Sequence, residues 1–345
     1  MSESASRPGP PPAGQAAGPP RLPVGVRAID RLMKSNKAFS IEHMDERALR
    51  RAQTTVLPDA GPAALVASLF LGRPRAGVTI ATASFPAAHG QVPLRVYVPD
   101  RPAGPRPVVV HFHGGGFALG NARQGDWICS TVAADLDAVV VSVDYRLAPT
   151  HRFPAAVEDC YEALVWTVAH ADELGGDPER VGVMGDSAGG NLAAVVAIMA
   201  REQGGPLVRH QALVYPATDL TDALRETESY RANTRGIVLS NADMEIFRRH
   251  YLDEAVDSTD WRLSPLHAPD LAGLPPAVVV VAGLDPLHDV GVAYAEALVA
   301  AGGSARVEDF HVMPHGFLSF PYFSRGAKPA LAAIVASQRA ALAGD

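Results

Sequence analysis

Gly185-Asp186-Ser187-Ala188-Gly189 is the stretch of this sequence that decides the fold. It follows a short apolar run, Val181–Met184, that predicts a strand, and it precedes a helix-forming run, Asn191–Met199. A serine in a sharp turn between a strand and a helix, with glycines two positions before and after it, is typical of a nucleophilic hydroxyl. The alternative is a glycine-rich helix N-terminus that Ser187 merely caps. The strand–turn–helix setting favours the nucleophile, because the dipole of the following helix stabilises negative charge beside it.

The chain around this turn alternates between predicted strands and predicted helices. The predicted strands are Val78–Phe85, Val92–Val98, Val108–Phe112, Ala138–Val143, Val181–Met184, Gln211–Tyr215, Ala277–Ala282 and Ala305–Val312. The predicted helices are Asp126–Leu136, Ala155–His170, Ala188–Glu202, Asp289–Ala301 and Ala327–Leu342. Such alternation indicates an α/β fold with a mostly parallel sheet covered by helices on both faces.

Two segments depart from this alternation. Residues 24–75 have a helical pattern, and residues 216–275 separate the sixth predicted strand from the seventh. The second segment contains a predicted helix, Asn241–Leu252, with Ser240 or Asn241 as its N-cap. A connection of that length in a compact domain is usually a lid or a functional insertion. We therefore expect both segments to form a cap over the carboxyl ends of the strands. The catalytic domain would then comprise residues 76–215 and 276–345, with a disordered tail at 1–23 rich in Pro, Gly, Ala and Ser.

A glycine run, His113-Gly114-Gly115-Gly116, follows the third predicted strand. Acyl transfer passes through a tetrahedral oxyanion, which needs N–H donors that are fixed in advance. Backbone donors suit this role when no side chain crowds them, so the run predicts an oxyanion hole rather than a merely flexible loop. We expect Gly115 and Gly116 to donate together with Ala188, and Gly114 to shape the turn. His113 is expected to be structural and to hold the loop through a hydrogen bond.

The acid and the base should follow the serine in chain order. Asp285 comes directly after the seventh predicted strand, and His315 comes directly after the eighth. Asp289 competes for the role of the acid, but it is better placed to cap the following helix. His288 and His311 compete for the role of the base; His288 shares the acid's own loop, and His311 lies within a strand pattern. The sequence therefore predicts a triad of the serine with Asp285 and His315.

These motifs together resemble the bacterial hormone-sensitive-lipase-like carboxylesterases, also called family IV. The resemblance runs from Val78 to the C-terminus, and Asp186 before the serine resembles one branch of that family. The segments that carry it are His113–Gly116, Asp144–Pro149 with Phe153–Ala156, Gly185–Gly190, Asp285–Asp289 and His315–Phe317. One departure is Thr150, where the family usually has Glu.

The resemblance implies an α/β-hydrolase fold with an eight-stranded sheet and a helical cap built from the N-terminus and an insertion. It also implies hydrolysis of short- to medium-chain acyl esters without a cofactor or metal, and frequent homodimers, commonly through the edge of the eighth strand. Several apolar residues are candidates for the acyl pocket, with plain core packing as the alternative for each. They are Met33, Phe39, Phe117, Met244, Phe247, Phe317 and Leu318.

The composition of the chain bears on its partners, its location and the state of its cysteines. The formal net charge is −7 and no basic run occurs, which argues against nucleic acid as the main partner. We expect no membrane span, because no apolar stretch reaches the necessary length, and we expect a cytoplasmic location, because the N-terminus lacks the pattern of a secretory signal. Cys129 and Cys160 are the two cysteines; both lie in predicted helices and are expected to be free thiols.

Other activities share parts of this pattern. An amidase or a lactonase can use the same triad, and some relatives of this fold bind ligands without turnover. A receptor of that kind lacks the base, whereas this chain has a candidate for every member of the triad. A peptidase with a similar turn usually has a large accessory domain, and no segment here fits one.

Overall fold

The computed structural model describes residues 22–35, 41, 44, 46–54, 61–102 and 104–344. Its centre is an eight-stranded sheet with the strand order β1-β2-β4-β3-β5-β6-β7-β8. The strands are β1 (Val78–Ala87), β2 (Gly90–Pro99), β3 (Arg106–Phe112), β4 (Val139–Val143), β5 (Gly176–Asp186), β6 (Val208–Val214), β7 (Ala277–Leu284) and β8 (Ala305–Pro314). β2 runs antiparallel to both of its neighbours, and all other pairs are parallel. The predicted α/β fold with a mostly parallel, eight-stranded sheet is confirmed.

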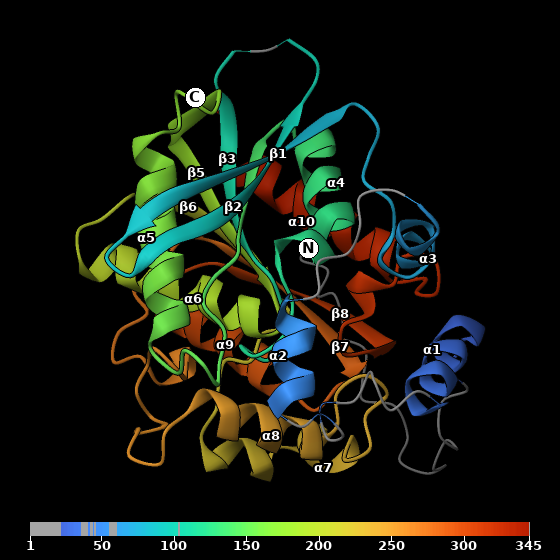
Figure 1. Ribbon diagram of the computed structural model, residues 1–345. Coiled ribbons are helices and arrows are strands. Elements are labelled where there is room, and N and C mark those ends of the chain that lie inside the picture. The colour runs from blue at the N-terminus through green and yellow to red at the C-terminus, as the bar shows by residue number, and fades with distance from the viewer. Residues whose placement is uncertain are drawn as a thin grey trace, which may run out of the picture.

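Helices cover both faces of this sheet (Figure 1). They are α4 (Asp126–Leu136), α5 (Ala155–Ala169), α6 (Ala188–Glu202), α9 (His288–Ala300) and α10 (Ala327–Ala341). α4 and α10 pack on one face, and α5, α6 and α9 pack on the other, so two hydrophobic layers enclose the sheet. The valines of β4 are fully buried between these layers, as expected of a central strand.

The observed bounds agree with the sequence predictions where the apolar pattern is strong. α4 and α6 begin and end at the predicted residues. β5 differs most, because it begins at Gly176 rather than at Val181. Gly176 pairs with Arg106 of β3, and the register of the two strands shifts after this pair. The residues that extend β5, 176–180, are not an apolar run. The periodicity of the sequence therefore could not reveal that extension.

The remaining helices come from the N-terminal region and from the segment between β6 and β7. They are α1 (Val24–Ser35), α2 (Glu46–Thr54), α3 (Pro62–Leu71), α7 (Glu228–Ala232) and α8 (Asn241–Tyr251). α7 and α8 lie beyond the carboxyl ends of the strands (Figure 1). Ser240 is the N-cap of α8 and forms a reciprocal capping box with Asp243. Of the two predicted caps, Ser240 is therefore the one used.

The segment after α8 returns to the body of the molecule. Leu263, Leu271 and Leu274 belong to the same buried cluster as α5 and α6. The predicted cap insertion, 216–275, thus contains both the projecting helices and a stretch that packs on the main core. Most of the predicted tail, 1–21, lies outside the described residues.

Cys129 on α4 and Cys160 on α5 are buried and are free thiols, as predicted. Among the helices that the structure describes, none is both long enough and apolar enough to cross a bilayer.

Candidate active site

The turn between β5 and α6 holds Ser187 in a strained conformation. The serine has φ 57° and ψ −117°, a left-handed φ that a residue with a side chain rarely adopts. The glycines around it are required for space. A Cβ at Gly185 would lie 2.1 Å from the carbonyl oxygen of Gly189, and a Cβ at Gly189 would lie 1.9 Å from that of Phe112. The close contact of the glycines, together with the strain at the serine, indicates a turn built to present a hydroxyl group.

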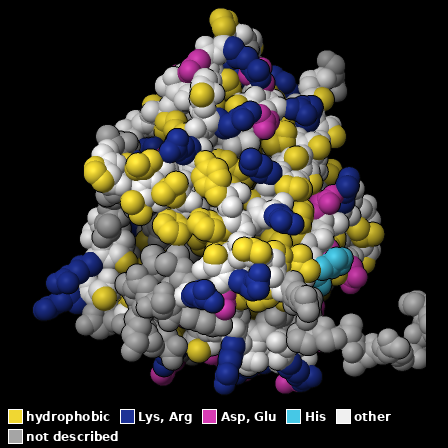
Figure 2. All heavy atoms as spheres, turned by 90° about the vertical axis from the view of Figure 1, so that its right-hand side faces the viewer, with side chains coloured by type: hydrophobic (Ala, Val, Ile, Leu, Met, Phe, Trp, Pro, Cys, Tyr) yellow, Lys and Arg dark blue, Asp and Glu magenta, His cyan; other side chains and the backbone are white. Residues whose placement is uncertain are grey.

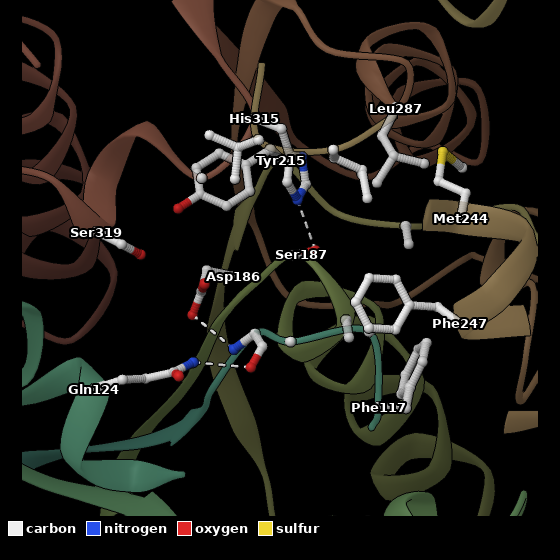
Figure 3. A pocket seen from close by; sticks show the side chains of 18 of the residues that line it. Phe117, Gln124, Asp186, Ser187, Tyr215, Met244, Phe247, Leu287, His315 and Ser319 are labelled. Atoms are coloured by element: carbon white, nitrogen blue, oxygen red, sulfur yellow. Dashed lines mark hydrogen bonds between the residues drawn. The ribbon is translucent and has the colours of Figure 1, made fainter. Parts of the chain in front are cut away.

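Three strand-end turns bring a hydroxyl, an imidazole and a carboxylate into one hydrogen-bonded row. Nε2 of His315 lies 2.8 Å from Oγ of Ser187 (Figure 3). Nδ1 of His315 lies 2.6 Å from Oδ2 of Asp285. Asp285 is fully buried, and its Oδ1 accepts the N–H of Leu287 at 2.8 Å. The carboxylate is therefore fixed from the backbone side and is oriented toward the imidazole. The ring of Tyr215 packs against that of His315, with 4.8 Å between the ring centroids.

The competing acid and bases have other partners. Asp289 is not the N-cap of α9, because Leu287 holds that position; the predicted cap is wrong. Its carboxylate instead accepts the N–H of Ser229 at 2.8 Å and contacts His288, and so joins α9 to α7. Nε2 of His288 lies 3.2 Å from Asp309, and exposed His311 forms an ion pair with the same carboxylate. Asp289, His288 and His311 thus bind groups other than Ser187, and His315 is the histidine that contacts the serine hydroxyl.

The glycine loop after β3 lines the same cavity as Ser187 and Ala188. Gly115 and Gly116 have φ values of 125° and 61°, which favour glycine. The N–H of Gly114 is already used, because it donates to Oδ1 of Asp186 at 3.1 Å. No described residue accepts a hydrogen bond from the amides of Gly115, Gly116 or Ala188. Ala188 is the first residue of α6, where backbone N–H groups have no partner within the helix.

The side chains that hold this loop were missed by sequence reasoning. The carboxylate of Asp186 accepts the N–H of Gly114, and Nε2 of Gln124 donates to the carbonyl oxygen of Gly114 at 2.8 Å, so the peptide groups before and after Gly114 are both fixed (Figure 3). Buried His111 lies beneath them, with Nδ1 2.8 Å from Oγ of Ser142 and Nε2 3.7 Å from Oδ1 of Asp186. Burial alone would lower the pKa of His111, but Cys129 and Asp186 raise that pKa to about 10. The only signal in the sequence was the Asp before the serine.

His113 is structural, as predicted. Its Nδ1 lies 2.8 Å from the carbonyl oxygen of Gly114, so Nδ1 carries the proton and donates. The ring stacks on Tyr145 with 4.2 Å between centroids, and the Tyr145 hydroxyl donates to the His113 carbonyl oxygen. Burial lowers the pKa of His113, so the ring is neutral. Thr150, at the position where the resemblance implied Glu, lies exposed in a turn.

A cavity of about 290 Å³ opens over Ser187. Figure 3 shows Met244, Phe247, Leu287 and Phe117 on one side of the serine, and Gln124, Tyr215 and Ser319 on the other. Phe117, Met244 and Phe247 therefore line the cavity, as the sequence suggested. Other lining residues were not anticipated; among them are Leu71, Leu220, Leu239 and Phe320.

Phe317 and Leu318 do not line this cavity, which corrects the expectation for both. They are fully buried in the hydrophobic layer formed by α4 and α10. Gly316 has φ 70°, and this turn directs the chain after the histidine back toward the sheet. Phe39 and the side chain of Met33 lie outside the described residues.

α8 packs directly on the glycine loop. A Cβ at Gly116 would lie 2.2 Å from the ring of Phe247, so that ring covers the loop where it faces the cavity. The rings of Phe117 and Tyr251 stack with 3.9 Å between their centroids. Gln53 of α2 donates to the carbonyl oxygen of Ala118, just after the loop, and to that of Ala148, after β4. The helices beyond the strand ends therefore hold the oxyanion loop as well as the cavity.

The described residues contain no group of three or more His, Cys, Asp and Glu side chains arranged to hold a metal ion. The row of hydroxyl, imidazole and carboxylate is an arrangement that could activate a serine as a nucleophile.

Comparisons with known proteins agree with this geometry. Residues 109–319 match a family described as having the alpha/beta hydrolase fold. The chain is 39% identical to the carboxylic ester hydrolase LipN of Mycobacterium tuberculosis, over 90% of this chain and 81% of LipN. It is 37% identical to an arylesterase of Saccharolobus solfataricus, over 68% of this chain and 76% of that protein.

Solved structures extend the comparison to three dimensions. An esterase from the archaeon Pyrobaculum calidifontis is 36% identical, with a TM-score of 0.81 over 92% of this chain and 97% of that one. EstE1, a thermostable carboxylesterase cloned from a metagenomic library, is 43% identical, with a TM-score of 0.75 over 81% of this chain and 93% of that one.

Proposed function

The chain belongs to the alpha/beta hydrolase family, and from that premise we propose that it cleaves carboxylic esters with Ser187 as nucleophile, His315 as base and Asp285 as the orienting acid. It is a carboxylesterase, as are its relatives of 39% and 43% identity. The observation that carries the assignment of residues is the unbroken row of hydrogen bonds from the serine hydroxyl to the buried carboxylate.

The reaction follows from the positions of these groups. Nε2 of His315 takes the proton as Oγ of Ser187 bonds to the ester carbonyl carbon, and the carbonyl oxygen becomes the oxyanion. The amides of Gly115, Gly116 and Ala188 stabilise that charge. The C–O bond to the alcohol then breaks, and the alcohol leaves with the proton from His315. Water, activated by the same imidazole, hydrolyses the acyl-enzyme and restores the serine.

Asp285 keeps the imidazole in the productive tautomer. Its Oδ2 accepts the proton on Nδ1, so Nε2 is left with the lone pair that faces Oγ of Ser187. The same carboxylate stabilises the imidazolium that forms during attack.

The cavity supports short- to medium-chain acyl esters as the substrate class. Its volume of about 290 Å³ is at the low end for small-molecule sites, which span about 300–1,000 Å³. We assign the acyl chain to the apolar side formed by Met244, Phe247 and Leu287, and the alcohol to the side of Gln124 and Ser319. The cap formed by the N-terminal helices and the insertion would then set the length of the acyl chain.

The remaining expectations stay predictions. These are the cytoplasmic location, the absence of a nucleic-acid partner and the homodimer. Light scattering of the purified chain tests the last of them, because a dimer doubles the mass of 36.3 kDa.

A panel of p-nitrophenyl esters from acetate to palmitate tests the proposed activity. We expect the highest kcat/KM at short to medium chains and a loss of at least about 10⁴-fold in kcat for Ser187→Ala. Ser84→Ala is the matched control, because Ser84 is an exposed serine of β1 that does not line the cavity, and it should retain most of the activity. An optimum at long, emulsified chains would overturn the substrate class. Cleavage of an anilide without cleavage of any ester would favour an amidase. Cleavage of a lactone without cleavage of any of these esters would favour a lactonase.

A further inference from the structure

Helix α3 has an unusual composition for a helix on the surface. Its sequence, Pro-Ala-Ala-Leu-Val-Ala-Ser-Leu-Phe-Leu, contains no charged residue, and the hydroxyl of Ser68 donates to the helix's own backbone at Leu65. A surface helix normally presents a polar face to water. Here Leu65, Val66 and Leu69 are 53%, 55% and 50% exposed. Leu69 follows Leu65 by four positions and Val66 by three, so the three side chains form one apolar face.

Two other segments extend this face. A Cβ at Gly25 of α1 would lie 1.8 Å from the carbonyl oxygen of Phe323, and the ring of Phe323 stacks on Phe70 of α3, with 5.6 Å between centroids. α1, α3 and the loop before α10 therefore meet at Phe323. We call their exposed apolar side chains the α3 patch; its members are Val24, Leu65, Val66, Leu69 and Tyr322. Figure 2 shows apolar side chains gathered on the side of the molecule that carries these segments.

Cationic side chains surround the α3 patch. The described side chains of these segments and of their immediate continuations include six cations and one acid, Asp30. The cations are Arg27, Arg31, Arg73, Arg75, Arg325 and Lys328, and Arg75 forms an ion pair with Asp135. Val24, Arg27 and Arg31 share a helical face, so apolar and cationic groups project together. This local excess of positive charge occurs in a chain with a net charge of −7. Lysines and arginines lie around the apolar side chains on this face (Figure 2).

The α3 patch adjoins the catalytic cavity. Leu71, the last residue of α3, lines the cavity over Ser187, and so does Phe320, two residues before Tyr322. A Cβ at Gly72 would lie 2.7 Å from the ring of Pro321, so the two segments are in contact beside the cavity. A molecule that leaves a surface docked on the patch would therefore enter the cavity beside the apolar side chains of Leu71 and Phe320.

We propose that the α3 patch docks this protein on an anionic lipid surface, from which apolar esters enter the catalytic cavity. An interfacial helix buries its apolar face about 5–10 Å into the boundary between headgroups and acyl chains, and cations beside it bind the anionic headgroups. A second copy of the chain fits less well. In a two-fold dimer the same patch would face itself, which would place the arginines of one protomer against those of the other. The inference rests on the proposed esterase activity for its substrate, but not for the docking itself.

Flotation with lipid vesicles tests the docking. We expect the wild-type chain to float with vesicles of phosphatidylcholine and phosphatidylglycerol, to bind pure phosphatidylcholine at least about tenfold more weakly, and to be released by high salt. Leu65→Glu with Leu69→Glu should weaken binding to the anionic vesicles at least about tenfold. The control is Leu207→Glu with Val299→Glu, which changes two similarly exposed apolar residues elsewhere by the same charge and should bind as the wild type does.

Kinetics separate this inference from the proposed activity. Both double variants should hydrolyse water-soluble p-nitrophenyl acetate at the wild-type rate, and the α3 variant alone should lose hydrolysis of an ester dissolved in the vesicles. Failure of the wild-type chain to float, or equal loss in both double variants, would overturn the docking. So would a dimer that the α3 variant dissociates in the absence of vesicle binding. A chain that floats but hydrolyses no ester would overturn the proposed function and leave the docking in place.

Discussion

Asp186→Ala tests how the oxyanion loop is held. The carboxylate accepts the N–H of Gly114 at 3.1 Å and lies 3.7 Å from buried His111. A hydrogen bond to a charged group contributes about 1.5–3 kcal/mol. If all of this energy serves to fix the loop for the transition state, its loss lowers kcat by about 10- to 150-fold. KM should change little, because the loop donors act mainly on the oxyanion rather than on the bound ester.

Steady-state kinetics with p-nitrophenyl butyrate measure this effect, and urea unfolding measures the accompanying loss of stability, which we expect to be about 1–3 kcal/mol. Asp186→Asn is the matched control, because it keeps an acceptor oxygen for Gly114 and removes only the charge. It should retain kcat to within about tenfold, since a neutral hydrogen bond is weaker but still formed. A folded Asp186→Ala enzyme with wild-type kcat would refute the reasoning, as would an equal loss in both variants.

Three further perturbations test other parts of the account. Phe247→Ala widens the acyl side of the cavity, so kcat/KM for butyrate should fall about tenfold or more while the chain-length optimum moves to longer esters; an unmoved optimum contradicts the acyl assignment. Asn191→Ala removes bonds of 2.6 Å to the carbonyl oxygens of Ala217 and Leu263, and we expect urea unfolding to show a loss of about 2–4 kcal/mol, whereas a loss under about 0.5 kcal/mol would contradict their role. Burial lowers the pKa of His210 to about 4, from about 6.5 in an unfolded chain. The unfolded state therefore binds the proton first, and stability should fall by roughly 3 kcal/mol as the pH drops through that window. His210→Gln should lose less over the same range, and an equal loss in urea titrations at pH 7 and pH 4.5 would exclude this histidine as the cause.

The sequence was sufficient for the parts of the fold that local pattern controls. α4 and α6 begin and end at the predicted residues, because an uninterrupted apolar period and a following polar or αL residue mark both limits. The positions of Ser187, Asp285 and His315 could be inferred because each follows a strand, and the carboxyl ends of parallel strands meet at one edge of a sheet.

Contacts between distant segments could not be inferred in this way. Phe247 and Phe317 are the same residue type, and only Phe317 follows a catalytic motif in the sequence, yet Phe247 lines the cavity and Phe317 is buried in the core. Gly316, just before Phe317, has φ 70°, a left-handed conformation that no periodicity reveals. The hydrogen bond from the N–H of Gly114 to Asp186 likewise joins residues 72 positions apart in the chain. Asp289 resembled a helix cap in sequence because its partner, Ser229, lies in a different segment.

The measurement that tests the triad most directly is labelling with a p-nitrophenyl phosphonate, followed by mapping of the adduct by mass spectrometry. The reagent reacts only with a nucleophile that a neighbouring base activates. We predict one adduct per chain, on Ser187, with complete loss of activity and labelling slowed by at least about 10³-fold in His315→Ala. An inactivated enzyme whose adduct lies on another residue, or a His315→Ala variant labelled at the wild-type rate, would contradict the account.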